Sequence, residues 1–118
     1  IYVIGGYGGA QGVDEYDPET NNWTTKSEMP SARRSLSTSA LDGRIYAFGG
    51  YVPGVSGHTG VTTVEVYDPA TDIWTAAPDM PTGRFGLRTS VVGGKIYVIG
   101  GMDKWVGSAY RTVVEYDP

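Results

Sequence analysis

Short apolar runs separated by glycine, proline and acidic residues form the main pattern of this chain. Three of these runs end in a glycine pair, and they lie at residues 1–6, 45–50 and 96–101. Each is continuously apolar and rich in β-branched or aromatic residues, as expected for a strand that is covered on both faces. The chain shows no sustained helical apolar period with capping residues. The pattern therefore predicts strands and no helix.

A second kind of run ends in the sequence Tyr-Asp-Pro and recurs out of phase with the first. Its copies lie at residues 13–18, 64–69 and 113–118. Proline cannot donate a hydrogen bond to a sheet, and an aspartate before it can cap a turn, so each strand is expected to end there. A short piece centred on Trp23 or Trp74 follows the first two copies. A mixed apolar and small segment, 35–41 or 84–92, precedes a glycine-pair run.

The spacing of these elements identifies a repeat. The starts of the glycine-pair runs lie 44 and 51 residues apart, and several other residues recur at a separation of 51. These recurring pairs are Trp23 and Trp74, Met29 and Met80, Pro30 and Pro81, and Arg33 and Arg84. Each unit divides into four short predicted strands joined by turns. A repeat of this length with four strands per unit is typical of a propeller blade.

On these residues the chain resembles the Kelch repeat, whose marks are a glycine pair, then a tyrosine and a tryptophan, with Met-Pro and arginine before the next unit. The resemblance covers essentially the whole chain in three phased copies. It implies an all-β fold, a Kelch-type β-propeller fragment with about two and a half four-stranded antiparallel blades. We expect residues 1–30 to form strands two to four of one blade, 31–81 a complete blade, and 82–118 strands one to three of another.

The regular residues of the repeat are expected to serve the fold. A glycine pair can cradle phosphate where a helix N-terminus follows, and no helix is predicted here. The repeated aromatic residues are expected to fill the layer between adjacent blades; they are Tyr16, Tyr67, Trp23 and Trp74. Arg33 and Arg84 could bind a carboxylate, but the resemblance implies that they bridge blades and donate to backbone carbonyls.

Departures from the repeat are the candidate binding positions, because a rigid scaffold positions its connecting loops for function. In the Kelch family the segments after each glycine pair border one mouth of the central channel. By that resemblance the candidates are Tyr7, Tyr51, His58, Met102, Trp105 and Arg111. Trp105 lies outside the repeated tryptophan position. It could anchor a protein or a sugar, or it could fold back over its own loop.

Arg34 and Arg88 complete the set of candidates. Each lies in or beside the first strand of its blade, which lines the channel in this family. Each also lacks a counterpart, since Phe85 and Ser37 occupy the matching places. The two arginines could form an anion-accepting mouth, or they could simply be solvated or ion-paired. His58 is the only histidine, and a metal site built on imidazoles needs several. We expect no metal and no cofactor.

Composition narrows the classes of function. The net charge is −4 and no basic run is present, which disfavours nucleic acid and anionic membranes as partners. No apolar stretch approaches the roughly 20 residues of a membrane span. One histidine and no cysteine cannot supply a Ser/His/Asp or Cys/His arrangement. Glu15, Glu65 and Glu115 occupy repeat positions, so they are not an evident catalytic pair.

These exclusions favour a non-catalytic scaffold that presents loops to a protein or carbohydrate ligand. The alternative is a sugar-processing enzyme similar to the sialic-acid mutarotases among bacterial Kelch proteins, which rests on fold analogy. Closure of a propeller needs roughly 4–8 blades, and an open array exposes strand edges. We therefore expect the other blades to come from a longer chain or, as the alternative, from identical subunits. The plain repeat and the absence of cysteine favour a bacterial or extracytoplasmic protein.

Overall fold

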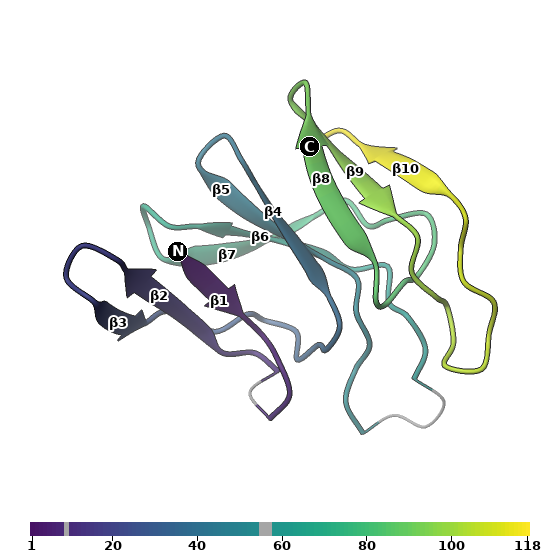
Figure 1. Cartoon of the computed structure of the whole chain (residues 1–118), viewed down its shortest axis with the longest axis horizontal. Helices are drawn as coiled ribbons and strands as arrows, with labels where there is room; N and C mark the ends of the chain where they lie inside the picture. The colour runs from purple at the N-terminus through teal and green to yellow at the C-terminus, as the bar shows by residue number, and fades with distance from the viewer. Residues whose placement is uncertain (9, 55–57) are drawn as a thin grey trace.

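The chain folds into three antiparallel sheets that lie side by side in Figure 1. This computed structural model describes residues 1–8, 10–54 and 58–118. The first sheet contains β1 (Tyr2–Ile4), β2 (Val13–Asp17) and β3 (Asn22–Thr25). The second contains β4 (Ser37–Leu41), β5 (Arg44–Phe48), β6 (Val64–Asp68) and β7 (Ile73–Ala77). The third contains β8 (Arg88–Val92), β9 (Lys95–Ile99) and β10 (Val113–Tyr116). The predicted all-β fold of Kelch-type blades is confirmed.

Each sheet is a meander, because strands that follow one another in the chain are also neighbours in the sheet. The four strands of the second sheet make up one whole repeat unit. By the repeat spacing, the first sheet corresponds to strands two to four of that unit and the third to strands one to three. The expected divisions after residues 30 and 81 fall in the connections β3–β4 and β7–β8, and they stay predictions.

The turns between strands follow the chemistry of the sequence. Asp17 Oδ1 accepts a hydrogen bond from the backbone N–H of Glu19 at 3.0 Å, and Asp68 Oδ1 accepts one from Ala70 at 2.9 Å. Such a carboxylate cap ends a strand where proline interrupts the ladder. The β4–β5 hairpin turns through Asp42 and a glycine that both have positive φ. This backbone matches the twist of paired strands in a two-residue hairpin.

The hydrophobic core lies mainly between the second and third sheets. Its buried members are Tyr46, Phe48, Val64, Val66, Met80, Leu87, Ile96, Val98 and Tyr116. The inner strands β4 and β8 meet through hydroxyl groups: the Thr89 hydroxyl accepts from Ser39 at 2.8 Å and donates to the Thr38 carbonyl at 3.1 Å. The two sheets are therefore joined by apolar packing outside and by hydrogen bonds at the inner strands.

The repeated tyrosine fills the layer between blades at both junctions: buried Tyr116 packs edge-on against Phe48 of the second sheet, with ring centroids 5.0 Å apart. Tyr67 is fully buried and packs edge-on against Tyr2 of the first sheet, with ring centroids 5.7 Å apart. Trp74 Nε1 donates to the Ser27 carbonyl at 2.9 Å across the same junction. Trp23 lies on the other face of the first sheet, and 59% of it is exposed. The interblade position expected for Trp23 stays a prediction, because no further sheet among the described residues lies over that face.

Candidate binding mouth

Arg33 fixes the loops between the first and second sheets. Its side chain is 1% exposed and donates to the carbonyl oxygens of Gly49 and Thr63, the latter at 3.1 Å. It also forms an ion pair with Glu65, 2.9 Å long. Burial lowers the pKa of this guanidinium, and the hydrogen bond and charge of Glu65 act against that shift. Because the Arg33 backbone N–H donates to Ala10 in the first sheet's loop, the residue bridges two blades.

Arg84 holds the next junction in the same manner. Its guanidinium donates to the Gly100 carbonyl at 2.9 Å and to the Thr112 hydroxyl at 2.8 Å. The planar group lies 4.4 Å from the centroid of the Tyr110 ring. Its backbone N–H donates to the Val61 carbonyl at 3.1 Å in the second sheet's loop. The interblade role implied for these two arginines is confirmed by their contacts.

The loops that follow the glycine pairs gather at one end of the molecule, along the lower edge of Figure 1. Backbone bridges connect the second and third of these loops to the segments that lead into the inner strands β4 and β8. Tyr51 pairs with Arg34, and Met102 pairs with Phe85 at the equivalent place. A further bridge between Thr59 and the third sheet's loop joins neighbouring loops directly. This lattice of backbone bonds holds the loops in fixed positions relative to one another.

An aromatic cluster forms where the second and third loops meet. The Tyr51 ring lies 4.8 Å from His58 and 5.5 Å from Phe85, both edge-on. Trp105 lies 5.4 Å from His58 and is nearly parallel to Phe85, with an interplanar angle of 9°. Phe85 is buried, whereas 62% of Trp105 is exposed. Trp105 therefore packs across the neighbouring loop instead of folding back over its own, and it still presents a face to solvent.

Arg34 extends this surface toward the first loop. Its guanidinium lies 4.4 Å above the ring of Tyr7, which is 93% exposed. The Nε atom of Arg34 is buried and has no hydrogen-bond partner among the described residues. We call the six side chains that meet here the mouth cluster; they are Tyr7, Arg34, Tyr51, His58, Phe85 and Trp105. Five of them were predicted from the sequence.

The other three predicted residues lie outside the mouth cluster. Met102 contributes backbone, since it exchanges two hydrogen bonds with Phe85 at 3.0 and 2.9 Å. Arg88 is exposed and donates to the carbonyl of its own neighbour, Leu87. Arg111 is also exposed. Phe85 was not among the predicted candidates, although its departure from arginine at the place that matches Arg34 was the signal that could have identified it as a member of the cluster.

Comparison with known proteins identifies the repeat. A sequence model of the Kelch motif matches residues 32–81 and 83–118. These ranges make up more than half of the chain. The chain belongs to the Kelch family.

Relatives in the Kelch family come from animals, fungi and plants. Kelch-like protein 35 of Mus musculus is 31% identical over 123 residues, which cover 100% of this chain and 20% of that protein. Kelch-like protein terF of Aspergillus terreus is 36% identical over 113 residues, which cover 86% of this chain and 25% of that protein. This chain therefore spans a quarter or less of the length of these Kelch relatives.

A solved structure shows the same arrangement of blades. The structure of YjhT superposes with a TM-score of 0.68 and 27% sequence identity. The superposition covers 79% of this chain and 28% of YjhT. The three sheets are therefore neighbouring blades of a Kelch propeller.

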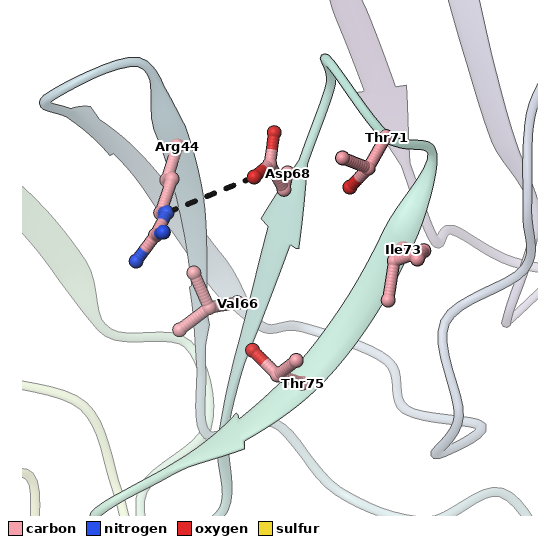
Figure 2. Close-up of a pocket in the computed structure, with 6 residues that line it drawn as sticks. All are labelled: Arg44, Val66, Asp68, Thr71, Ile73 and Thr75. Atoms are coloured by element: carbon pink, nitrogen blue, oxygen red, sulfur yellow. Dashed lines mark ion pairs between the residues drawn. The ribbon is translucent and has the colours of Figure 1, made fainter.

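Two shallow hollows lie away from the mouth, on the face of the second Kelch blade. Figure 2 shows the larger, of about 230 Å³, where Arg44 and Asp68 form an ion pair 3.9 Å long. The smaller, of about 190 Å³, is lined partly by Tyr46 and Tyr116, which belong to the second and third blades. At the preceding junction β7 covers the matching place, with Trp74 bound to the first blade. We therefore assign these hollows to blade packing.

The described part of the chain holds no group of three or more His, Cys, Asp or Glu side chains placed to bind a metal ion. It also contains no helix of the length and apolar character that a membrane crossing requires.

Proposed function

We propose that this Kelch segment is a non-catalytic binding scaffold that presents the mouth cluster to a protein or carbohydrate ligand. The observation that supports this function is the convergence of side chains from three successive loops on one surface. Tyr7, Tyr51 and Trp105 come from three different blades, and Tyr7 and Trp105 remain largely exposed. A rigid scaffold that gathers loop residues at one mouth is a common way to build a binding site.

The side chains of the mouth cluster are suited to recognition. Tryptophan, tyrosine and arginine are the residues most enriched at binding hot spots, because each combines a large contact area with a polar group. The cluster as defined contains neither a carboxylate nor a thiol. Its one imidazole, that of His58, has neither a carboxylate nor a thiol beside it in the cluster. The remaining chemistry is stacking, apolar contact and charge, which favours binding over acid–base or nucleophilic catalysis.

The backbone arrangement lowers the entropic cost of binding. Arg34 and Tyr51 exchange two backbone hydrogen bonds, each 2.9 Å long, and Phe85 pairs with Met102 in the same way. Loops that are already ordered lose little conformational freedom when a ligand docks. The other blades of the propeller are expected to come from a longer chain, as the greater length of the Kelch relatives supports.

Substitution of Trp105 tests this function. A displayed random peptide library and a panel of oligosaccharides are selected against the intact protein, and the affinity of the strongest ligand is measured by calorimetry. We expect Trp105→Ala to weaken binding roughly thirtyfold, the effect of losing a hot-spot side chain worth about 2 kcal/mol.

Val92→Ala is the matched control, since Val92 is also an exposed apolar residue but lies at the end of β8 far along the strand from the mouth. Its affinity should equal that of the unmodified protein. If Trp105→Ala binds the selected ligand as tightly as Val92→Ala does, the mouth cluster is not the binding site.

A further inference from the structure

Two side chains of the second blade hold the backbone of one residue, Ser27, in the segment that follows the first blade. The Asp72 carboxylate accepts a hydrogen bond from the Ser27 backbone N–H at 3.0 Å, and the Trp74 indole N–H donates to the Ser27 carbonyl at 2.9 Å. We call this pair of contacts the Ser27 clamp. Because β6 runs away from the mouth loops, the turn that carries Asp72 lies at the opposite end of the blade.

Asp72 is itself fixed within the second blade. The Tyr67 hydroxyl donates to the same carboxylate oxygen, Oδ1, at 2.6 Å. The backbone of Asp72 has a φ of 57°, a conformation that aspartate and asparagine adopt more readily than most residues. One carboxylate oxygen therefore accepts hydrogen bonds from two blades at once. An ionised carboxylate is a stronger acceptor than a neutral group, so the charge of Asp72 strengthens both bonds.

The junction between the second and third blades has no equivalent of the Ser27 clamp among the described residues. Pro78 takes the place of Ser27, 51 residues later, and a proline has no backbone N–H to donate. Tyr116, the equivalent of Tyr67, donates directly to the Pro78 carbonyl at 3.0 Å. A hydroxyl group and a carbonyl do not change their protonation in acid. The two junctions therefore differ in whether a carboxylate joins the blades at this place.

The segment that connects the first and second blades is also held at its other end, nearer the mouth. The side chain of Gln11 donates to the Met29 carbonyl at 3.0 Å, and the Met29 backbone N–H donates to the Gln11 carbonyl at 2.9 Å. The Arg33 backbone N–H donates to the Ala10 carbonyl at 3.1 Å in the same loop. These bonds join amide groups, which do not titrate. Only the end of the connection at the Ser27 clamp depends on a carboxylate.

The titratable groups around Asp72 come from each element packed against it: Tyr67 of β6, Tyr2 of β1, Glu15 of β2 and Lys26 after β3. The Tyr67 hydroxyl and then the backbone N–H of the clamp hold the pKa of the Asp72 carboxyl below its ordinary value of 3.8, and the Lys26 charge acts in the same direction. Burial raises the pKa of both tyrosines, so they stay neutral in acid. Glu15 also titrates in acid, but its partners Tyr2 and Lys26 belong to its own blade.

We propose that Asp72 is an acid-sensitive switch, in which protonation of the carboxylate releases the Ser27 clamp while the mouth end of this junction and the next junction stay closed. Because the folded-state pKa is lowered, the ionised carboxylate stabilises the closed junction above about pH 3.8 and loses this effect as the pH falls through the folded pKa. The first blade is then held to the second through the mouth end. This property is independent of the binding function proposed above.

Amide hydrogen exchange of the intact protein on both sides of pH 3.8 tests the switch. Each rate is expressed as a protection factor, which removes the intrinsic pH dependence of exchange and reports local opening. We expect the protection factor of the Ser27 amide to fall roughly tenfold in acid, the effect of losing a charge-assisted hydrogen bond. The Gly50 amide is the internal reference, since it donates to the Arg84 carbonyl at 2.7 Å across the next junction. Its protection should not change.

Two variants of the same turn separate Asp72 from its neighbours. Asp72→Asn keeps an acceptor oxygen that does not titrate, and Asn21 holds the equivalent place in the first blade, where it accepts from the Tyr16 hydroxyl at 3.1 Å. In this variant the protection of Ser27 should be independent of pH. Asp68→Asn is the matched control, because Asp68 caps the turn within its own blade. It should lose Ser27 protection in acid as the unmodified protein does.

The indole N–H resonance of Trp74 gives a second measurement on the unmodified protein, and it should shift over the same pH range as the clamp is released. An equal loss of Ser27 protection in Asp72→Asn and in the unmodified protein would show that Asp72 is not the switch. Loss of protection at Ser27 and Gly50 together would mean that the whole chain unfolds in acid, and separate release of the first junction would be wrong. A constant protection factor of Ser27 in the unmodified protein would overturn the proposal outright.

Discussion

The second and third blades bind equivalent arginines in different surroundings. Arg33 lies between carbonyl oxygens of the second blade and the carboxylate of Glu65. Arg84 lies at the same place before the third blade, where Val114 takes the position of Glu65. No ion pair joins Arg84 to a described residue, and the Thr112 hydroxyl and the Tyr110 ring contact it instead. Both junctions therefore keep the arginine and its carbonyl acceptors, but the carboxylate of Glu65 has no equivalent at the junction of Arg84.

This difference shows which contacts the fold requires at a blade junction. The carbonyl oxygens at the ends of the strands accept from both arginines, so they are the common element. A buried guanidinium needs hydrogen-bond acceptors, and a carboxylate is one way to add charge compensation. A hydroxyl group together with an aromatic face is another way to stabilise the buried guanidinium. The two junctions should therefore differ in how much they lose when the arginine is removed.

Replacing each arginine by methionine gives the largest expected difference. Arg33→Met leaves the Glu65 carboxylate buried and without its cation, which should lower the free energy of unfolding by about 3–5 kcal/mol. Arg84→Met leaves no buried charge behind, so the loss should be about 1–3 kcal/mol from its hydrogen bonds. Urea unfolding of the intact protein, followed by circular dichroism, measures both.

The double variant Arg33→Met/Glu65→Val is the control for this interpretation. It removes the unpaired carboxylate and makes the junction resemble that of the third blade at this position. It should therefore recover part of the stability that Arg33→Met loses. Equal losses for the single and double variants would show that Glu65 is not the cause of the difference.

The glycine pairs provide a second, smaller contrast between the two blades. A Cβ atom on Gly49 would lie 2.3 Å from the Arg84 carbonyl oxygen, whereas one on Gly100 would have its nearest neighbour at 3.6 Å. Both glycines have positive φ, so alanine adds backbone strain of about 1–2 kcal/mol at either place. The overlap at Gly49 should raise its total loss of stability to about 2–4 kcal/mol.

Thermal unfolding of Gly49→Ala and Gly100→Ala in the intact protein compares the two positions. A lower Tm for Gly49→Ala is expected, because the β5 end is pressed against the segment that leads into the third blade. The same Tm for both variants would contradict a tighter junction at the second blade.

The fold could be predicted from the sequence because each blade repeats the same local signals. The glycine-pair runs became β1, β5 and β9, and each Tyr-Asp-Pro run became a strand that ends near its proline. These signals are local, since turn residues and apolar runs determine where a strand starts and ends. The surroundings of a side chain are not local in this sense: Trp23 and Trp74 hold the same place in the repeat, but only Trp74 contacts a neighbouring sheet among the described residues.

The structure was also needed to show on which face of its strand each of the three glutamates lies. Glu15 and Glu115 directly precede the repeated tyrosine, whereas Glu65 precedes it by two residues. A shift of one position moves a side chain to the other face of a strand. Glu65 is therefore buried against Arg33, while Glu15 and Glu115 pair with lysines on the opposite face.

The sequence predicted which loops carry the mouth cluster, but it did not predict which side chains of these loops contact one another. The sequence identified Tyr7, Tyr51, His58 and Trp105 as departures from the repeat, and Arg34 as a residue without a counterpart. Contacts between loops of different blades, such as Phe85 with Trp105, depend on how the blades pack. Arg88 and Arg111 were also predicted, yet Arg88 donates to the carbonyl of Leu87 and Arg111 is exposed, and no contact with the mouth cluster is found for either among the described residues.

Glu115 of the third blade gives the smallest expected effect, because its position holds Val66 in the second blade. The Lys95 ammonium and then the Tyr97 hydroxyl hold the pKa of the exposed Glu115 carboxyl below its ordinary value of 4.5. A lowered pKa in the folded state means that the ionised carboxylate stabilises the fold above about pH 4.5 and loses this effect as the pH falls through the folded pKa.

Carbon-detected NMR titration of the intact protein should therefore place the Glu115 midpoint below 4.5. In Lys95→Gln the midpoint should rise but stay below 4.5, since the Tyr97 hydroxyl still donates to the carboxylate at 3.1 Å. An unchanged midpoint in Lys95→Gln would mean that the surface ion pair does not persist in solution, as happens for many exposed pairs.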